Sequence, residues 1–212
     1  MFFLGVNFGE SAGSATYVVL KKTLKNIKKH YHLNAIKRFP SGIDYPEIEN
    51  EIIKTYNDRK FIVNKRIFSQ DRRPAKNVRV CPTIVAGFTG MDTDQIDNLR
   101  KKKIPVEGIS VYREERWQRE NYGPICLGNN YYVPEGELIR NLSSVFKQNR
   151  LIIENEIPFS EYLINEIEVL EMEKPLKEDD ISEGRLKEND DVISALSMPL
   201  WFCETIRIIR RY

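Results

Sequence analysis

The sequence predicts an α/β fold in which a mixed central β-sheet is flanked by helices. Antiparallel hairpin strands come first, because apolar runs follow one another across short connections at 2–7, 15–21 and 30–39. A parallel crossover comes second, where a strand over 81–87 leads through a capped helix into a strand over 104–112. The C-terminal half is mainly helical, and its last helix is apolar nearly all round.

The N-terminal half carries clear local signals for its first elements. The stretch "FFLGVNFGESAGSATYVVLKK" is typical of a hairpin whose first arm stops at Asn7. After the turn "FPSGIDYP", a helix is predicted near 45–57, since Pro46 stands at an early helical position where its missing N–H costs little. The basic segment over 59–79 has poor periodicity, so it is either an extra hairpin or a loop inserted before the next strand. "CPTIVAG" is a continuous apolar run, as in strands buried on both faces of a parallel sheet.

The C-terminal half contains three amphipathic or apolar helical patterns. Apolar residues recur on one face of "PEGELIRNLSSVFKQN" and of "PFSEYLINEIEVLEM". The acidic segment over 174–189 is expected to be a flexible loop. The final pattern, "NDDVISALSMPLWFCETIRII", begins at an Asn/Asp cap, and we expect this helix to pack deep against the sheet.

Length and composition indicate one globular domain over 1–212. With 41% hydrophobic and 30% charged residues and no biased tract, the chain is neither disordered nor fibrous. No segment approaches the roughly 20 apolar residues of a membrane span, so we expect no membrane partner and a cytoplasmic location. Three widely spaced cysteines without a CxxC pair encode neither a disulfide framework nor a structural zinc site.

Charge is distributed unevenly along the chain. The net charge is only +2, but residues 1–106 hold 20 Lys and Arg against 10 Asp and Glu, whereas residues 107–212 hold 13 against 21. The basic clusters "LKKTLKNIKKH", "VNKR", "DRRPAKNVR" and "LRKKK" could line a phosphate backbone, although such clusters are more commonly solvated surface. Our candidate nucleic-acid contacts are Lys65, Arg66, Arg72, Arg73, Lys76, Arg100, Lys101 and Lys102.

Four segments together resemble a known family. In order they are "YHLNAIKRFPSGIDYPEI", "TIVAGFTGMD" followed by "IDNLRKKKIPVEGISV", "YYVPEGELIRNLSSVFKQNRLII" and "NDDVISALSMPLWF". They resemble the RNase H-like nuclease domain of phage large terminases, and the likeness covers almost the whole chain. It implies an RNase H-like fold, double-stranded DNA as a partner, and a packaging or mobile-element protein as another, in a phage or prophage context.

The resemblance also implies where a metal centre would lie. In that family two Mg²⁺ or Mn²⁺ ions cut a phosphodiester bond, held by carboxylates at the ends of the first and fourth strands and the start of the last helix. By position these sites fall on Asn7, on Gly87, and on Asp190 with Asp191. Hard cations need several anionic oxygens. Asn7 brings no charge and Gly87 no side chain, so the resemblance implies an inactive or weakened nuclease.

Three hypotheses remain open from the sequence. The first is a non-catalytic module that needs no metal and keeps the fold to bind DNA or a protein. The second is an active Mg²⁺- or Mn²⁺-dependent DNA endonuclease in which Glu10, Asp92 or Glu107 supplies the missing ligands, although these residues equally suit a turn, a helix N-terminus and a strand. The third is a prophage remnant with no role beyond folding.

One absence limits these hypotheses. Large terminases carry an ATPase motor ahead of the nuclease, and the 212 residues contain no G-x-x-x-x-G-K-[ST] loop. We therefore expect the chain not to package DNA alone, and to be either an excised domain or a free-standing relic of the family.

Overall fold

The computed structural model describes residues 1–9, 15–67, 76–89, 94–112, 124–172 and 191–206. The strands are β1 (Phe2–Asn7), β2 (Thr16–Lys25), β3 (Lys28–Arg38), β4 (Val63–Ile67), β5 (Lys76–Val80), β6 (Thr83–Thr89), β7 (Val106–Tyr112), β8 (Ile125–Leu127), β9 (Asn130–Pro134) and β10 (Leu151–Ile152). The helices are α1 (Tyr45–Asn57), α2 (Asp94–Lys101), α3 (Glu135–Lys147), α4 (Ser160–Met172) and α5 (Asp191–Thr205), with a short 3₁₀ helix over Arg59–Phe61.

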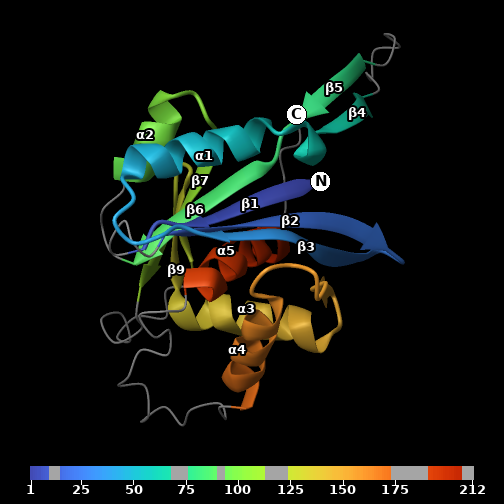
Figure 1. Ribbon diagram of the computed structural model, residues 1–212. Helices are drawn as coiled ribbons and strands as arrows, with labels where there is room; N and C mark the ends of the chain where they lie inside the picture. The colour runs from blue at the N-terminus through green and yellow to red at the C-terminus, as the bar shows by residue number, and fades with distance from the viewer. Residues whose placement is uncertain (10–14, 68–75, 90–93, 113–123, 173–190, 207–212) are drawn as a thin grey trace.

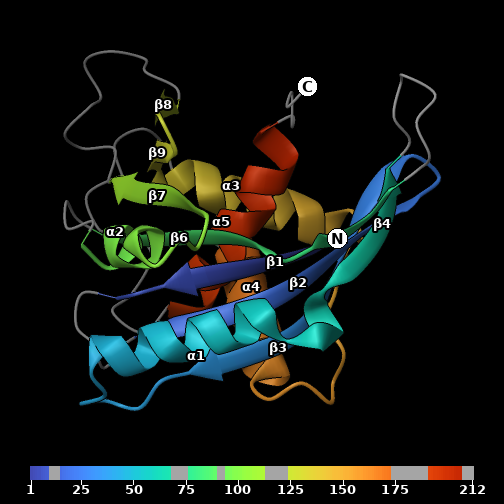
Figure 2. The same ribbon diagram turned by 90° about the horizontal axis from the view of Figure 1, so that it is seen from above.

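These elements form layers around one eight-stranded mixed sheet (Figure 1). The sheet has the order β10-β3-β2-β1-β6-β7-β9-β8. β1, β2 and β3 pair antiparallel, whereas β1–β6, β6–β7 and β7–β9 pair parallel. Helices α1 and α2 cover one face, α5 covers the other, and α3 and α4 lie outside α5, as the turned view also shows (Figure 2). The predicted fold class, with an antiparallel hairpin followed by a parallel crossover, is confirmed.

Strand β1 is central because both of its faces are apolar. Phe2, Leu4 and Val6 belong to the core beneath α1 and α2, while Phe3 belongs to the core around α5. All six residues of the strand are buried. A strand in the middle of a sheet that is covered on both sides is expected to be apolar throughout rather than alternating. Asn7 is therefore the exception, and it stands where the strand ends.

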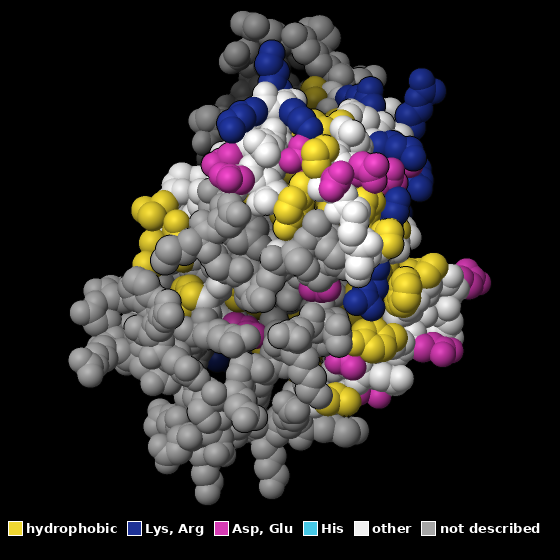
Figure 3. All heavy atoms as spheres, turned by 60° about the vertical axis from the view of Figure 1, so that its left-hand side comes forward, with side chains coloured by type: hydrophobic (Ala, Val, Ile, Leu, Met, Phe, Trp, Pro, Cys, Tyr) yellow, Lys and Arg dark blue, Asp and Glu magenta, His cyan; other side chains and the backbone are white. Residues whose placement is uncertain are grey.

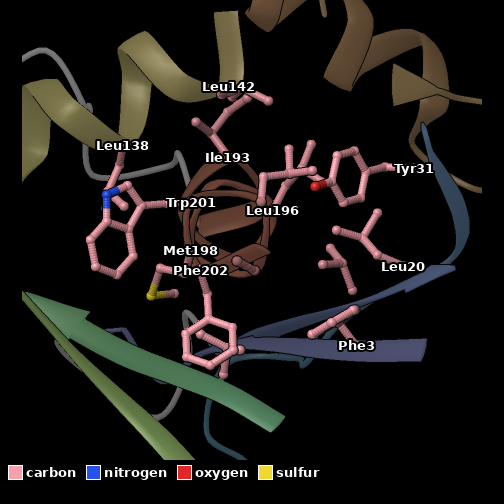
Figure 4. Packing of buried hydrophobic residues seen from close by; sticks show 14 of the residues in the cluster. Phe3, Leu20, Tyr31, Leu138, Leu142, Ile193, Leu196, Met198, Trp201 and Phe202 are labelled. Atoms are coloured by element: carbon pink, nitrogen blue, oxygen red, sulfur yellow. The ribbon is translucent and has the colours of Figure 1, made fainter. Parts of the chain in front are cut away.

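Helix α5 packs directly on the sheet as the most deeply buried helix (Figure 4). Trp201 is fully buried, makes an edge-on ring contact with Tyr131 at 5.8 Å, and donates an indole hydrogen bond to Glu137. Burying an aromatic side chain of this size contributes about 3 kcal/mol when its N–H is satisfied. The prediction that the last helix packs deep against the sheet is confirmed.

A proline inside α5 meets a glycine of β1. Pro199 has no N–H, so the carbonyl of Ala195, four residues earlier, lacks its helical partner. That carbonyl faces Gly5: a Cβ built on Gly5 would lie 2.1 Å from the Ala195 oxygen and 2.7 Å from Cγ of Pro199. Only glycine permits this approach, which lets the helix backbone lie against the strand backbone.

The structure differs from the sequence prediction in a few elements. Of the two alternatives for the basic segment over 59–79, the structure agrees with the hairpin: after the 3₁₀ helix, β4 and β5 pair antiparallel as a separate two-stranded sheet. Strands β8, β9 and β10 were not predicted, because they are two to five residues long and too short to show a period. The acidic segment over 174–189 lies outside the described residues. No helix in the described ranges is long and apolar enough to cross a bilayer.

Candidate functional site at the end of β1

The ends of β1 and β6 bring two of the predicted site residues side by side. Asn7 and Gly87 are partners in the parallel β1–β6 register, and the N–H of Phe8 donates to the Gly87 carbonyl at 3.1 Å. The Asn7 side-chain oxygen accepts a hydrogen bond from the N–H of Gly9 at 3.2 Å. This local bond turns the chain out of the strand, which is a common role for asparagine.

The start of α5 completes this group. Asp191 is the first residue of the helix and is only 8% exposed. The Asn7 side-chain nitrogen donates to Asp191 Oδ1 at 3.2 Å. The structure thus brings Asn7, Gly87 and Asp191 together, while their role as a metal site stays a prediction. Asp190, the other member of the predicted pair, lies outside the described residues.

The direction of the Asn7 hydrogen bond matters for charge. A carboxylate at position 7 would set two anions against each other at about 3 Å, an arrangement that requires a cation or a shared proton. The amide instead offers an N–H to the Asp191 carboxylate and needs neither. The asparagine therefore satisfies Asp191 within the protein.

Gly87 is closed by packing. A Cβ built on Gly87 would lie 2.4 Å from the Met198 sulfur and 2.4 Å from the Ile109 carbonyl oxygen. The close view shows the Met198 side chain directed from α5 toward β6 (Figure 4). Methionine fills irregular gaps in cores easily. The space that a side chain on β6 would need is therefore occupied by the protein itself.

Among the described residues at this end of the sheet, one buried hydroxyl has no hydrogen-bond partner. Thr16 faces Asn7 across the β1–β2 pair, is fully buried, and its hydroxyl oxygen has no hydrogen-bond partner. A buried unsatisfied hydroxyl costs about 1–3 kcal/mol unless a water reaches it. It adds a neutral oxygen to the group and no charge.

The described donor set does not fit two divalent ions. Asn7 and Thr16 are neutral, Gly87 has no side chain, and Asp191 is the one carboxylate that these contacts bring in. Among the described residues, no group of three or more His, Cys, Asp and Glu side chains could hold a metal. Hard cations of this kind are held by several anionic oxygens.

The substitute ligands are only partly placed. Glu10 and Asp92 lie outside the described residues. Glu107 pairs in register with Val85, so it stands two residues before Ile109, the β7 partner of Gly87. In parallel pairing, register partners share a sheet face. Glu107 is therefore on the α5 face, separated from Asn7 by β6, and it has an interaction of its own.

The predicted nucleic-acid residues have mixed surroundings. Arg100 donates to the carbonyls of Val106 and Asn129 and to Asn130 Oδ1, and it pairs with Asp97, so it joins α2 to β7 and β9. Lys102 forms a salt bridge with the buried Glu49, while Lys101 and Lys65 are exposed. Arg72 and Arg73 lie outside the described residues, as do the side-chain surroundings of Arg66 and Lys76.

The opposite end of α5 carries a second polar cluster, at the base of the β2–β3 hairpin. Arg150 donates through both terminal nitrogens to the Glu204 carboxylate at 3.0 Å each, and Tyr31 donates its hydroxyl to the same group. Burial opposes ionisation of Glu204, but these hydrogen bonds and the charge of Lys29 outweigh it, so the pKa of Glu204 lies below its ordinary value. Burial raises the pKa of Tyr31.

A solved structure of similar fold identifies the architecture. The large terminase of a thermophilic bacteriophage superposes with a TM-score of 0.51 over 94% of this chain, at 11% sequence identity. The match spans 39% of that terminase, so this chain corresponds to about two fifths of its length. No family model matches the sequence, and no curated protein does. The chain thus has a terminase-like, RNase H-like α/β fold.

Sequence reasoning missed the residue that closes the site. Met198 stands in an apolar helix where any large side chain would look ordinary, and only the spatial pairing of α5 with β6 gives it a role. A usable signal was present at the other partner: "VAGF" places a glycine inside a buried strand, and such glycines often mark a close approach of another chain segment.

Proposed function

We propose that this chain is a terminase-nuclease-like domain that binds double-stranded DNA and has lost most or all metal-dependent cleavage. The observation that carries the proposal is the hydrogen bond from the Asn7 amide to Asp191. It lies where the family resemblance would put two metal ions, and it gives the Asp191 carboxylate an N–H donor in the place of a cation. The closed space at Gly87 supports the same interpretation.

The binding part of the proposal rests on charge and fold. The N-terminal half carries ten more basic than acidic residues, 20 against 10. Exposed lysine and arginine side chains gain affinity for DNA by releasing the cations condensed on its phosphates. The fold is shared with a phage large terminase. A packaging or mobile-element protein is a further partner that this fold would suit.

Cleavage and binding are tested separately. Supercoiled plasmid is incubated with the chain in Mn²⁺ and in chelator, beside a variant in which Asp190→Ala and Asp191→Ala remove the remaining carboxylates. DNA affinity is measured in chelator by fluorescence anisotropy over a salt series. We expect no more nicking by the chain than by the variant, together with DNA affinity that falls steeply with salt.

The rival result is equally clear. Mn²⁺-dependent cutting that disappears when Asp190 and Asp191 are changed would establish an active endonuclease, and the missing ligand would then be sought by changing Glu10, Asp92 and Glu107 one at a time. Absence of both cutting and DNA binding would overturn the proposal entirely and favour a role in protein binding or a remnant.

A further inference from the structure

The β2–β3 hairpin carries charge of one sign only. Between Glu10 and Asp44 the sequence contains no acidic residue, whereas β2 and β3 hold the basic residues Lys21, Lys22, Lys25, Lys28, Lys29, Lys37 and Arg38. Both views show the tip of this hairpin extending beyond α5 at the end of the sheet opposite Asn7 (Figures 1 and 2). It therefore projects positive charge away from the body of the protein.

The lysines of the two faces differ in their partners. On the α5 face, Lys29 donates to the Cys203 carbonyl and pairs with Glu204, so its charge is already used. On the α1 face lie Lys21, Lys25 and Lys28, which are exposed and take part in none of the ion pairs found among the described residues. Lys37, at the far end of the same face, pairs with Glu51 at 2.8 Å, so the unneutralised charge of the α1 face lies toward the hairpin tip.

Two of these lysines stand directly opposite each other. Lys25 and Lys28 are register partners at the end of the antiparallel pair. Like charges at directly opposed positions destabilise a hairpin. An anion lying across the two strands would remove this repulsion, and regularly spaced phosphates could do so along the whole ribbon.

Further positive groups adjoin this face at the root of the hairpin. The Lys21 ammonium lies 6.0 Å from the Phe2 ring centroid, and Phe2 and Phe61 are in edge-on contact at 5.4 Å. The Lys60 ammonium lies 4.7 Å from the Phe61 ring centroid and pairs with Asp58 at 3.3 Å, so its charge is partly neutralised. The buried aromatic pair thus joins the β2 lysine to the start of the β4–β5 hairpin. The β2–β3 and β4–β5 hairpins therefore both adjoin the Phe2–Phe61 pair.

Electrostatics link the same two hairpins. The pKa of the Met1 ammonium lies below its ordinary value, first because of burial and then because of the charges of Lys65, Lys21 and Lys22. Lys65 belongs to β4, so positive charge from β1, β2 and β4 meets at this place. Mutual repulsion of this kind marks a surface that would gain from a polyanion.

The tip of the hairpin is apolar and strained. Asn26 and Ile27 form its turn with φ values of 51° and 67°, in the left-handed region. Turns of this kind favour Asn-Gly, because a β-branched residue is strained at positive φ. Ile27 is 97% exposed, and Leu24 beside it is 72% exposed. An exposed isoleucine in a strained turn stabilises nothing within the protein.

We infer that the hairpin surface, defined as Lys21, Lys25, Lys28, Lys65 and the tip residue Ile27, is the DNA-binding surface of this domain. The lysines contact the phosphodiester backbone of a duplex, and Ile27 lies in a groove against sugars and base edges. Two-stranded ribbons fit the major groove, and apolar side chains are used as groove contacts by other DNA-binding proteins. This inference rests on the proposed DNA binding and assigns it to a specific place.

Duplex DNA fits this surface better than an anionic membrane does. Membrane-bound elements present a continuous apolar face, whereas here lysines outnumber the two exposed apolar residues. The face shown in Figure 3 offers a contrast within the same protein, since basic side chains there are mixed with acidic ones. The hairpin surface lacks such acidic neighbours within β2 and β3.

The test compares two triple variants of equal charge. One changes Lys21→Gln, Lys25→Gln and Lys28→Gln on the hairpin. The matched control changes Lys54→Gln, Lys103→Gln and Arg140→Gln, which are exposed basic residues in α1, just after α2 and in α3. Binding of a fluorescent duplex of about 30 base pairs is measured in chelator between about 25 and 200 mM KCl, with urea unfolding as the check on folding.

We expect the hairpin variant to bind about 30-fold more weakly at the lowest salt and to lose about 2–3 units of the log–log salt slope, since each lost phosphate contact removes about 0.9. The control variant should stay within about threefold of the unchanged chain. Ile27→Ala should weaken binding about three- to tenfold with an unchanged salt slope, because an apolar contact releases no cations.

The possible negative results distinguish the proposed DNA binding from its assignment to the hairpin surface. If the unchanged chain binds no duplex at low salt, the proposed function and this surface both fall. If it binds and the control variant loses as much affinity as the hairpin variant, DNA binding stands and the hairpin assignment is wrong. Tight binding to phosphatidylserine vesicles that is lost in the hairpin variant, with duplex binding unaffected, would reassign the surface to membranes.

Discussion

The two ends of the central sheet contrast in how their polar groups are used. At the carboxyl end of β1, Asn7 satisfies Asp191, and the space above Gly87 is filled by Met198. At the other end, Lys25 opposes Lys28 without a counter-charge. At the Asn7 end, polar groups are hydrogen-bonded and space is filled by packing. At the hairpin end, lysine charges remain that contribute nothing to the stability of the fold. A function is easier to infer at the hairpin end, because the repulsion between its lysines is not offset within the protein.

The packing against Gly87, at the Asn7 end of the sheet, is tested most strongly by Gly87→Asp. The new side chain has no space beside the Met198 sulfur and the Ile109 carbonyl, and it would bury a carboxylate, so we expect a loss of about 4 kcal/mol or more in the free energy of unfolding. Urea titration followed by circular dichroism measures it.

Gly87→Ala is the matched control for charge. It should cost about 2–3 kcal/mol from the steric clash alone. If Gly87→Asp is as stable as the unchanged chain, the space is open and a carboxylate at this position is again credible.

The cluster at the base of the hairpin is tested by Glu204→Gln. The depressed pKa of Glu204 means that its carboxylate stabilises the folded state at neutral pH, and this contribution is lost as pH falls through the folded-state value. We expect a loss of about 2 kcal/mol at pH 7.

The difference between the chain and the variant should shrink steadily below about pH 4, where the unchanged Glu204 also becomes protonated. Denaturation curves from pH 7 to about pH 3 check the sign. A constant difference across that range would show that the ionised form contributes nothing.

Asn7→Asp tests whether a second carboxylate beside Asp191 would allow a metal ion to bind. The variant loses the N–H donor and sets a second carboxylate beside Asp191, so we expect a loss of about 1–2 kcal/mol at pH 7 that diminishes as the pH is lowered. Because two carboxylates can share a cation, millimolar Mn²⁺ should recover part of the loss in thermal melts.

The double variant Asn7→Asp with Asp191→Asn is the control for Asn7→Asp. It restores one amide–carboxylate hydrogen bond with the two partners exchanged, and it should recover stability without Mn²⁺. Equal Mn²⁺ stabilisation of the single and the double variant would argue against a site-specific effect.

The smallest effect is expected at the hairpin tip. Ile27→Gly relieves the strain of a β-branched residue at φ 67°, so the free energy of unfolding should rise by about 0.5–1 kcal/mol. A gain in stability together with a loss of DNA affinity would show that Ile27 is kept for contact with a partner. Asn26→Gly, in the same turn, is the control, because asparagine tolerates this conformation and the change should be nearly neutral.

Sequence patterns predicted the fold well where the periodicity was strong. The helix over 45–57, the strand ending at Asn7 and the buried last helix all follow from apolar runs with defined ends. Strand β10 was missed because two residues carry no period, and its identity as a strand depends on pairing with β3. Pairing of this kind is a tertiary property.

The sequence indicated which residues meet at the candidate site, but not how their side chains interact. Asn7, Gly87 and Asp191 meet as the family resemblance implies, because the order of strands and helix brings these termini together. The closure by Met198 and the direction of the Asn7 hydrogen bond depend on packing distances that a sequence does not contain. The basic clusters were visible in the sequence, but which lysines already have partners became clear only in three dimensions.

The contact between β1 and α5 joins residues 184 positions apart. During synthesis, the N-terminal strands therefore leave the ribosome long before the helix that covers one of their faces exists. Until α5 has emerged, Phe3 and the rest of that face lack their cover, and exposed apolar surface of this kind promotes aggregation. The Gly5–Pro199 approach is thus a late event of folding, and a ribosome stalled before α5 would hold an unfinished domain.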